Sequence, residues 1–335
     1  MKKLLFFFLL GVICIGFLFP NNANAEKYEL KLGHLSAVGG LEDIVANKIA
    51  EEAYKNSNGQ LVINVFPASQ LGSSVSEIES IQMGTQDIFW GALGWLGNFV
   101  KDYQILLMPY AFRSQDHQLD FIDSPIALEL EKKLEDIGLL LMTKHSHGLP
   151  KVLLTSKPVF SVKDLKGLLM RVPEWPVSMK AWKALGTNIT VVAWGELYLA
   201  LAQGVAEGME CGFEFIYPGK FHEVAKYILK TEHCYELRGA IVGKKSYEKL
   251  PKDLQKVLMD ALHTGEELYN EPLDKIEQED TRNILKSGGV IIEVDREPFK
   301  KILLPLVDEL EAEGYWRKGL FDEVQDIKGP RSATN

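Results

Sequence analysis

The amino-acid sequence predicts an α/β fold in which parallel sheets are covered by helices. Short segments with the two-residue alternation of a strand take turns with longer segments of helical spacing, an order that is typical of parallel sheets. The 335 residues are also enough for two lobes of ordinary domain length. Because no repeat or flexible linker separates such lobes, we expect the chain to cross between them more than once.

The N-terminus has the pattern of a secretory signal peptide. Lys2 and Lys3 precede an unbroken apolar stretch, residues 4–19, and Ala23-Asn24-Ala25 then forms a small-x-small cleavage site. A membrane anchor is the alternative, but the apolar stretch is shorter than the ~20 residues that a span prefers. We therefore predict export and cleavage after Ala25.

The first elements after this leader are a strand, a helix and a second strand. Residues 28–36 alternate apolar and charged side chains, and residues 60–66 form a similar segment. Between them, residues 40–59 place their apolar side chains on one helical face. Ser74 and Glu77 have the Ser-x-x-Glu spacing of a capping box, which predicts the start of the next helix.

The middle of the chain repeats this alternation. Its predicted strands are residues 168–172, 188–192 and 205–211, and its predicted helices are residues 176–186 and 195–204.

From residue 250 a longer helical pattern begins. It extends to residue 289, and Pro272 should kink or break it. A helix of this length can pack across two lobes and tie them together. One more strand, residues 289–295, and one more helix, residues 298–314, follow.

Charge and cysteine content exclude some classes of protein. The formal net charge is −9, and the leader contains two lysines and no acidic residue, so the mature chain is more acidic still. A chain this acidic lacks the excess of basic residues that binding to nucleic acid or anionic lipid requires. Two cysteines remain, Cys211 and Cys234. They could form a disulfide after export, but two cysteines are no disulfide scaffold, and the sequence leaves the pairing open.

Arg171 is the most informative single residue. It lies in the apolar run Leu-Leu-Met-Arg-Val, at the end of a predicted strand. A buried charge is costly without a partner, so either a carboxylate of the chain, such as Glu174 or Glu210, or a ligand should supply one. In open α/β sheets ligands bind beyond the carboxyl ends of strands, which favours a ligand.

Catalytic motifs are missing from the sequence. It contains no nucleophile elbow, phosphate loop or His-Glu-x-x-His, and we assign no catalytic residue, metal ligand or cofactor. His145 and His147 could lie on one face of a strand, but no further ligand follows at metal spacing. A secreted hydrolase that uses Glu210 with His145 or His147 remains the alternative from another functional class.

Ordered motifs along the mature chain resemble those of the substrate-binding proteins of TRAP (tripartite ATP-independent periplasmic) transporters, the DctP-like family. They are "FPASQLGSSVSEIESIQMGTQDI", "LLMPYAFRSQDHQLDF", "SVKDLKGLLMRVPEW" and "WGELYLALAQGVAEGMEC", followed by "KFHEVAKY" and "SYEKLPKDLQKVL". Their order argues against the receptor of an ATP-driven importer.

The resemblance implies a two-lobed periplasmic binding protein fold with a ligand cleft between the lobes and a long helix tying them together. We expect residues 26–148 plus 237–276 in lobe I and residues 149–236 plus 277–335 in lobe II. The implied function is that of a monomeric periplasmic receptor. It would bind a small organic carboxylate, close on it and deliver it to the membrane permease subunits of a TRAP transporter.

The resemblance also implies site residues. Arg171 would grip the ligand carboxylate, since a guanidinium pairs with it bidentately and keeps its charge when desolvated. Lys151 best matches a second basic contact. Many members have Asn-Pro where this chain has Cys211 and Gly212, so the contact from that asparagine is missing. Glu210 and Glu214 could accept hydrogen bonds from ligand hydroxyl or amino groups.

Aromatic residues are frequent in the stretches that approach the cleft in the resembling fold. They are Trp90, Trp95, Trp175, Trp194, Phe213 and Phe215. Several aromatic rings around one site favour a ligand with an apolar or ring-shaped body. We therefore expect an aromatic or branched organic acid, with a sugar acid as the alternative.

Overall fold

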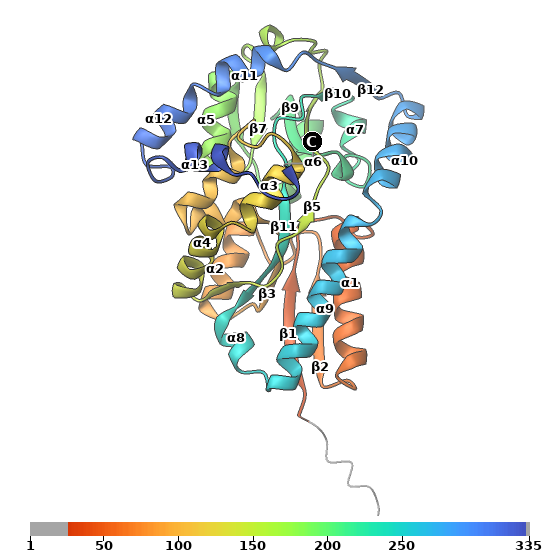
Figure 1. Cartoon of the computed structure of the whole chain (residues 1–335). Helices are drawn as coiled ribbons and strands as arrows, with labels where there is room; N and C mark the ends of the chain where they lie inside the picture. The colour runs from red at the N-terminus through yellow and green to blue at the C-terminus, as the bar shows by residue number, and fades with distance from the viewer. Residues whose placement is uncertain (1–25, 333–335) are drawn as a thin grey trace, which may run out of the picture.

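The computed structural model describes residues 26–332, which form two α/β lobes (Figure 1). The predicted signal peptide lies outside the described residues. None of the helices in residues 26–332 has both the length and the apolar character that crossing a membrane requires.

Lobe I is built on a six-stranded sheet with the order β2-β1-β3-β11-β4, in which β5 also pairs with β11. Its strands are β1 (Tyr28–Gly33), β2 (Leu61–Phe66), β3 (Ile88–Ala92), β4 (Leu139–Leu141), β5 (Ser146–His147) and β11 (Leu237–Gly243).

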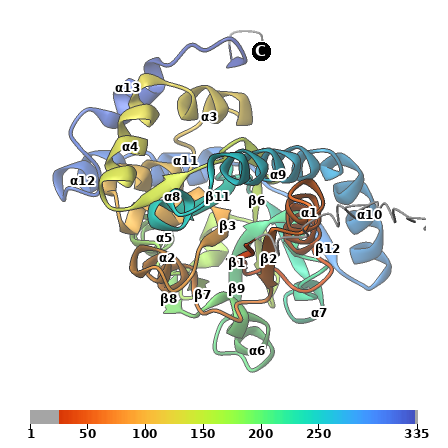
Figure 2. The same cartoon turned by 90° about the horizontal axis from the view of Figure 1, so that it is seen from below.

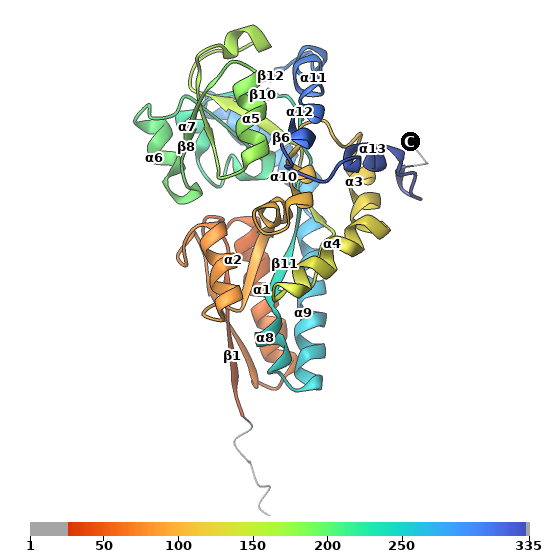
Figure 3. The same ribbon diagram turned by 90° about the vertical axis from the view of Figure 1, so that its left-hand side faces the viewer.

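Lobe II is built on a second six-stranded sheet with the order β12-β10-β6-β9-β7-β8. Its strands are β6 (Lys151–Thr155), β7 (Leu169–Val172), β8 (Asn188–Val191), β9 (Gly208–Gly212), β10 (Tyr227–Lys230) and β12 (Val290–Glu293). Figure 3 shows the two lobes one above the other.

Both sheets are mixed, so the prediction of parallel sheets is only partly right. In lobe I, β11 is antiparallel to β3, β4 and β5. In lobe II, β6 is antiparallel to β9 and β10. These two strands directly follow the crossings between lobes, and the crossings run side by side. The amide of Gly148 donates to the carbonyl of Glu236, and that of Lys151 to Cys234, each at 2.9 Å. Each reversed strand therefore begins where the lobes meet.

Helices cover the sheets. The α-helices are α1 (Leu41–Asn56), α2 (Ser74–Met83), α3 (Gln115–Ile122), α4 (Pro125–Asp136), α5 (Pro176–Ala184), α6 (Leu197–Ala202), α7 (Phe221–Val224), α8 (Lys244–Glu248), α9 (Lys252–Asn270), α10 (Leu273–Lys286), α11 (Glu297–Leu303), α12 (Leu306–Ala312) and α13 (Leu320–Asp326). The 3-10 helices are η1 (Leu93–Asn98), η2 (Lys101–Leu107), η3 (Val162–Leu165), η4 (Trp194–Glu196) and η5 (Phe213–Phe215).

The start of α2 differs from the predicted capping box. Ser73 is the N-cap residue, and its hydroxyl accepts a hydrogen bond from the amide of Ser76 at 3.3 Å. Glu77 is fully buried instead, and its carboxylate accepts a hydrogen bond from Gln86 at 2.7 Å. The cap thus lies one residue earlier than predicted, because Ser73 and Ser74 are both suitable caps and only tertiary packing decides between them.

The long helical pattern is interrupted at Pro272, as predicted, because proline lacks the amide that would continue the ladder. Helix α9 lies against α1 in lobe I (Figure 2). Gly265 allows this close contact, since a Cβ there would lie 2.5 Å from the Ile49 side chain. Helix α10 contacts η5 and β12 of lobe II. The pair α9–α10 therefore connects the two lobes.

Part of the C-terminal segment, residues 277–335, for which the sequence predicted lobe II, also packs against lobe I. Apolar side chains of α12 and α13 belong to the same core cluster as side chains of η2, α3 and α4 in lobe I. The ring of His117 in α3 contacts the carbonyl of Val324 at 2.9 Å, and Arg113 donates to the carbonyl of Gln325 at 2.8 Å. The other lobe boundaries stay a prediction.

Helix α9 provides a test of the core that supports both lobes. Leu258 is fully buried in α9, so Leu258→Ala should lower the free energy of unfolding by about 2–5 kcal/mol. The matched control is Leu285→Ala in α10, where the side chain is 52% exposed and little change is expected. Urea denaturation measures both, and equal effects of the two variants would contradict this packing.

Candidate functional site

A pocket lies between the two lobes, at the ends of the central strands. Its empty volume, including space open to solvent, is about 550 Å³. Lobe I and the returning crossing contribute Leu35, Glu42, Ala92, Trp95, Glu236 and Arg238. Lobe II contributes Lys151, Arg171, Trp175, Trp194, Glu210 and Phe215, with Cys211 and Gly212. An outer hollow shares Trp95, Arg171 and Trp194 with the pocket and extends it toward Glu174 and Glu196.

Arg171 is buried in the pocket wall and forms no ion pair with an acidic side chain of the described residues. Arg171 lies at the end of β7 and is 2% exposed. Its Nε donates a hydrogen bond to the carbonyl of Val192 at 2.9 Å. Its guanidinium lies over the ring of Trp194, 5.7 Å from the centroid. No carboxylate among residues 26–332 forms an ion pair with Arg171. The two internal partners expected from the sequence, Glu174 and Glu210, therefore do not pair with it. Burial lowers the pKa of Arg171 to about 10, against the opposing charge of Glu210, so the group remains charged at neutral pH.

Glu210 is held by a histidine instead. Its Oε2 lies 2.5 Å from Nε2 of His233, whose Nδ1 lies 2.8 Å from the hydroxyl of Thr231. Burial opposes ionisation, but the charges of Lys151 and His233 outweigh it and lower the pKa of Glu210 to about 2. The carboxylate is therefore ionised, and its Oε1 is buried without a hydrogen-bond partner in the described part of the chain.

Lys151 lies at the start of β6 and is already paired. Its Nζ is 3.0 Å from Oε1 of Glu236 and 3.9 Å from the centroid of the Trp175 ring. Burial acts to lower its pKa, but the charges of Glu236 and Glu210 outweigh it and raise the pKa. The second basic residue of the predicted site therefore lines the pocket, but its charge is balanced within the protein.

Three charged residues of the pocket were absent from the sequence prediction. Glu236 pairs with Arg238, and Arg238 also pairs with Glu42 at the start of α1. The Arg238 guanidinium lies over the ring of Phe215, 4.5 Å from the centroid. The signal that could have found Glu236 and Arg238 is the segment "ELRGAIVG", in which charged side chains border an apolar strand, as Arg171 does in its own run.

Aromatic side chains line the rest of the pocket. Trp95 of lobe I contacts Trp175 of lobe II, with ring centroids 4.8 Å apart. Trp194 meets Phe215 edge-on at 5.6 Å. The Trp175 Nε1 is buried without a hydrogen-bond partner in residues 26–332.

Three predicted site residues do not line the pocket. Trp90 is fully buried on the opposite face of β3 from Phe89 and Gly91, because successive strand side chains alternate. Phe213 packs in the core of the molecule. Glu214 accepts hydrogen bonds from the amide of Leu149 at 3.2 Å and the hydroxyl of Tyr269 at 3.3 Å, so it ties a crossing to α9.

The cysteines are not joined. Cys211 lines the pocket, and both Cys211 and Cys234 are buried free thiols. Burial raises the pKa of both thiols, which keeps them protonated at neutral pH.

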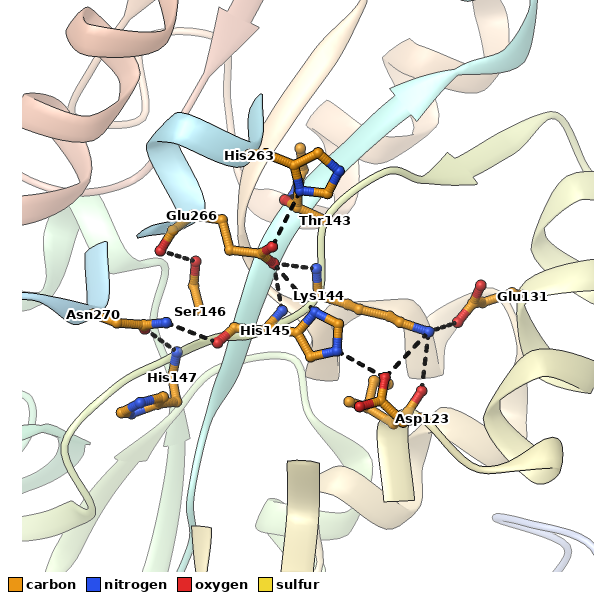
Figure 4. Close-up of polar contacts among 12 residues, drawn as sticks. Asp123, Glu131, Thr143, Lys144, His145, Ser146, His147, His263, Glu266 and Asn270 are labelled. Carbon is orange, nitrogen blue, oxygen red and sulfur yellow. Dashed lines mark hydrogen bonds and ion pairs between the residues drawn. The ribbon is translucent and has the colours of Figure 1, made fainter. Parts of the chain in front are cut away.

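The alternative hydrolytic pair is not assembled. Figure 4 shows His145 next to Asp123 and Glu266, and its Nε2 lies 2.7 Å from Oδ1 of Asp123. His147 is held through its backbone amide, which donates to Asn270 at 2.9 Å. The only histidine paired with Glu210 in the described residues is His233. The segment around His145 thus connects β5 to α9 beside the crossing.

The fold and the pocket define a two-lobed solute-binding protein. Residues 32–313 match the family of bacterial extracellular solute-binding proteins, family 7, and the chain belongs to this family. The family consists of solute receptors of TRAP transporters, not enzymes.

Relatives cover nearly the whole chain. A solute-binding protein of Roseobacter denitrificans is 29% identical over 293 residues, 87% of this chain and 90% of the relative. The C4-dicarboxylate-binding periplasmic protein DctP of Rhodobacter capsulatus is 27% identical over 308 residues, 90% of this chain and 92% of the relative.

Solved structures agree with this assignment. A TRAP periplasmic solute-binding protein of Polaromonas sp. JS666, bound to D-erythronate, superimposes with a TM-score of 0.83 at 28% identity, covering 90% of this chain and 100% of that one. One from Roseobacter denitrificans, with bound L-galactonate, gives a TM-score of 0.81 at 27% identity, covering 90% and 98%.

Glu214 provides a test based on pH. Burial raises the pKa of Glu214 to about 7, in spite of the nearby charge of Arg238. The folded chain therefore binds an additional proton between the unfolded pKa and about 7, so this group makes stability fall as the pH rises through that interval. Glu214→Gln should reduce the loss of unfolding free energy between pH 5 and pH 8 by up to about 3 kcal/mol.

Denaturant unfolding at both pH values measures this effect. Glu129→Gln, at an exposed position of α4, serves as the matched control and should leave the pH dependence unchanged. If Glu214→Gln loses as much stability as the wild type, Glu214 is ionised in the folded chain.

Proposed function

We propose that this chain is a periplasmic receptor that binds a small organic carboxylate through Arg171 and delivers it to the membrane components of a TRAP transporter. The observation that carries the proposal is the buried guanidinium of Arg171, which lines a pocket between two lobes and has no carboxylate partner in the described residues. A bidentate ligand carboxylate would supply the missing charge and hydrogen bonds.

Of the two ligand classes expected from the sequence, the hydroxylated acids have more support. The aromatic rings provide apolar walls, as an aromatic or branched acid requires. The same pocket, however, contains three acidic side chains, Glu42, Glu210 and Glu236, which can accept hydrogen bonds from hydroxyl groups. The D-erythronate and L-galactonate bound by relatives are hydroxylated carboxylates as well.

Lobe closure is the mechanism of capture. The pocket walls come from both lobes, so a ligand that touches both favours the form in which they are close together. It shifts the equilibrium only by its differential affinity for the two forms. Removal of water from the site strengthens the attraction between the carboxylate and Arg171. The membrane components would then recognise the closed form, and the receptor would act as a monomer.

Arg171 variants test the proposal. Protein freed of co-purified ligand by unfolding and refolding is titrated calorimetrically with D-erythronate, L-galactonate, galacturonate and phenylacetate. Arg171→Ala should weaken binding of the preferred acid by ~30-fold or more, because loss of one partner of a buried charge pair costs about 2–5 kcal/mol. The affinity of Arg171→Lys should lie between those of the wild type and Arg171→Ala, since an ammonium group carries the charge but cannot form the bidentate pair.

The control for this series is Arg282→Ala, which removes an exposed arginine of α10 and should leave the affinity unchanged. Unchanged affinity of Arg171→Ala for every acid that the wild type binds would contradict the proposal.

The proposed maturation has its own test. Expression of the full chain in a bacterium with a periplasm should yield a periplasmic protein that begins at Glu26, because the small-x-small site ends at Ala25. Intact-mass spectrometry of the periplasmic fraction measures the N-terminus. A product that retains the leader in the membrane fraction would show an anchor instead.

A further inference from the structure

The two ends of the pocket differ in charge. At one end, Arg171 has no ion-pair partner among residues 26–332. At the other end, every cation has one: Arg238 pairs with both Glu42 and Glu236, and Lys151 pairs with Glu236 at 3.0 Å.

Two aromatic rings separate the guanidinium groups at these ends. Arg171 lies over Trp194, Trp194 meets Phe215 edge-on, and Phe215 lies beneath Arg238. All four residues line the same pocket. A ligand whose carboxylate reaches Arg171 therefore extends along these rings toward the acidic pairs.

The far end offers acceptors rather than a free positive charge. Each ionised carboxylate has about four lone-pair sites, so Glu42 and Glu236 keep acceptor capacity after pairing with Arg238 and Lys151. Glu210, which also lines the pocket, has a buried Oε1 without a hydrogen-bond partner in the described residues. A hydroxyl group could donate to these oxygens, whereas a second ligand carboxylate would meet the like charges of these side chains.

We infer that Glu42 and Glu236 determine specificity: they accept hydrogen bonds from hydroxyl groups at the far end of the ligand and reject a second carboxylate. The site is then selective for hydroxylated monocarboxylates over dicarboxylates of the same length. The inference rests on the proposed function, since it assigns the ligand carboxylate to Arg171.

Three four-carbon acids test this selectivity by calorimetric titration. D-erythronate has one carboxylate and several hydroxyl groups, succinate has two carboxylates, and butyrate has one carboxylate alone. The wild type should bind D-erythronate at least tenfold more tightly than either of the others. Glu236→Gln removes one negative charge and leaves Lys151 and Arg238 with less compensation, so it should lower the preference for D-erythronate over succinate tenfold or more.

Glu42→Gln provides a second arm, because it leaves the pair between Lys151 and Glu236 in place. It should change the preference in the same direction. Asp280→Asn is the matched control, since Asp280 is as buried as Glu236 but lies outside the pocket, and it should leave the preference unchanged. Thermal unfolding without added acid verifies that each variant is folded.

Two results would overturn the inference. One is a wild type that binds succinate or butyrate as tightly as D-erythronate, or binds none of the three. The other is a preference that both folded variants leave unchanged. If Arg171→Ala still weakens acid binding by ~30-fold or more in those cases, only this inference fails. If Arg171→Ala binds as the wild type does, the proposed function fails with it.

Discussion

The buried charge of Arg171, with which no carboxylate of residues 26–332 pairs, is the constraint on which the rest of the structure depends. A guanidinium inside a protein is costly unless other groups compensate it. Within residues 26–332, the contacts of Arg171 are a hydrogen bond to the carbonyl of Val192 and the face of Trp194. Glu210, a candidate partner within lobe II, is held by His233. The remaining hydrogen-bonding capacity of Arg171 is thus available at the pocket, where a carboxylate ligand would add to the stability of the closed form.

The topology of the crossings supplies the rest of the pocket. Strands β6 and β11 each start where the lobes meet, whereas β3, β7 and β9 end there, so both kinds of strand contribute side chains to one site. The reversed strands provide Lys151 and Arg238, and Glu236 between the crossings pairs with both. The same residues that return the chain from one lobe to the other therefore form the charged wall of the pocket. Small movements of the lobes would therefore change the positions of these charged side chains directly.

The sequence was informative where the signal is local and less so where it depends on pairing between distant segments. Alternating patterns predicted the α/β fold, Pro272 predicted the break between α9 and α10, and a charge in an apolar run pointed to Arg171. The reversal of β6 and β11 has no local signature, because strand direction is decided by the crossing. The face on which Trp90 lies depends on the register of β3. Arg238 carried the same signal as Arg171, but its neutralisation by two distant carboxylates could not be read from the sequence.

A crystal structure of the chain with D-erythronate tests the central claim most directly. The account predicts that both oxygens of the ligand carboxylate accept hydrogen bonds from the terminal nitrogens of Arg171. It also predicts that ligand hydroxyl groups lie within hydrogen-bonding distance of Glu42 or Glu236. A carboxylate bound at Lys151 or Arg238, with Arg171 paired to a side chain of the protein, would contradict the account.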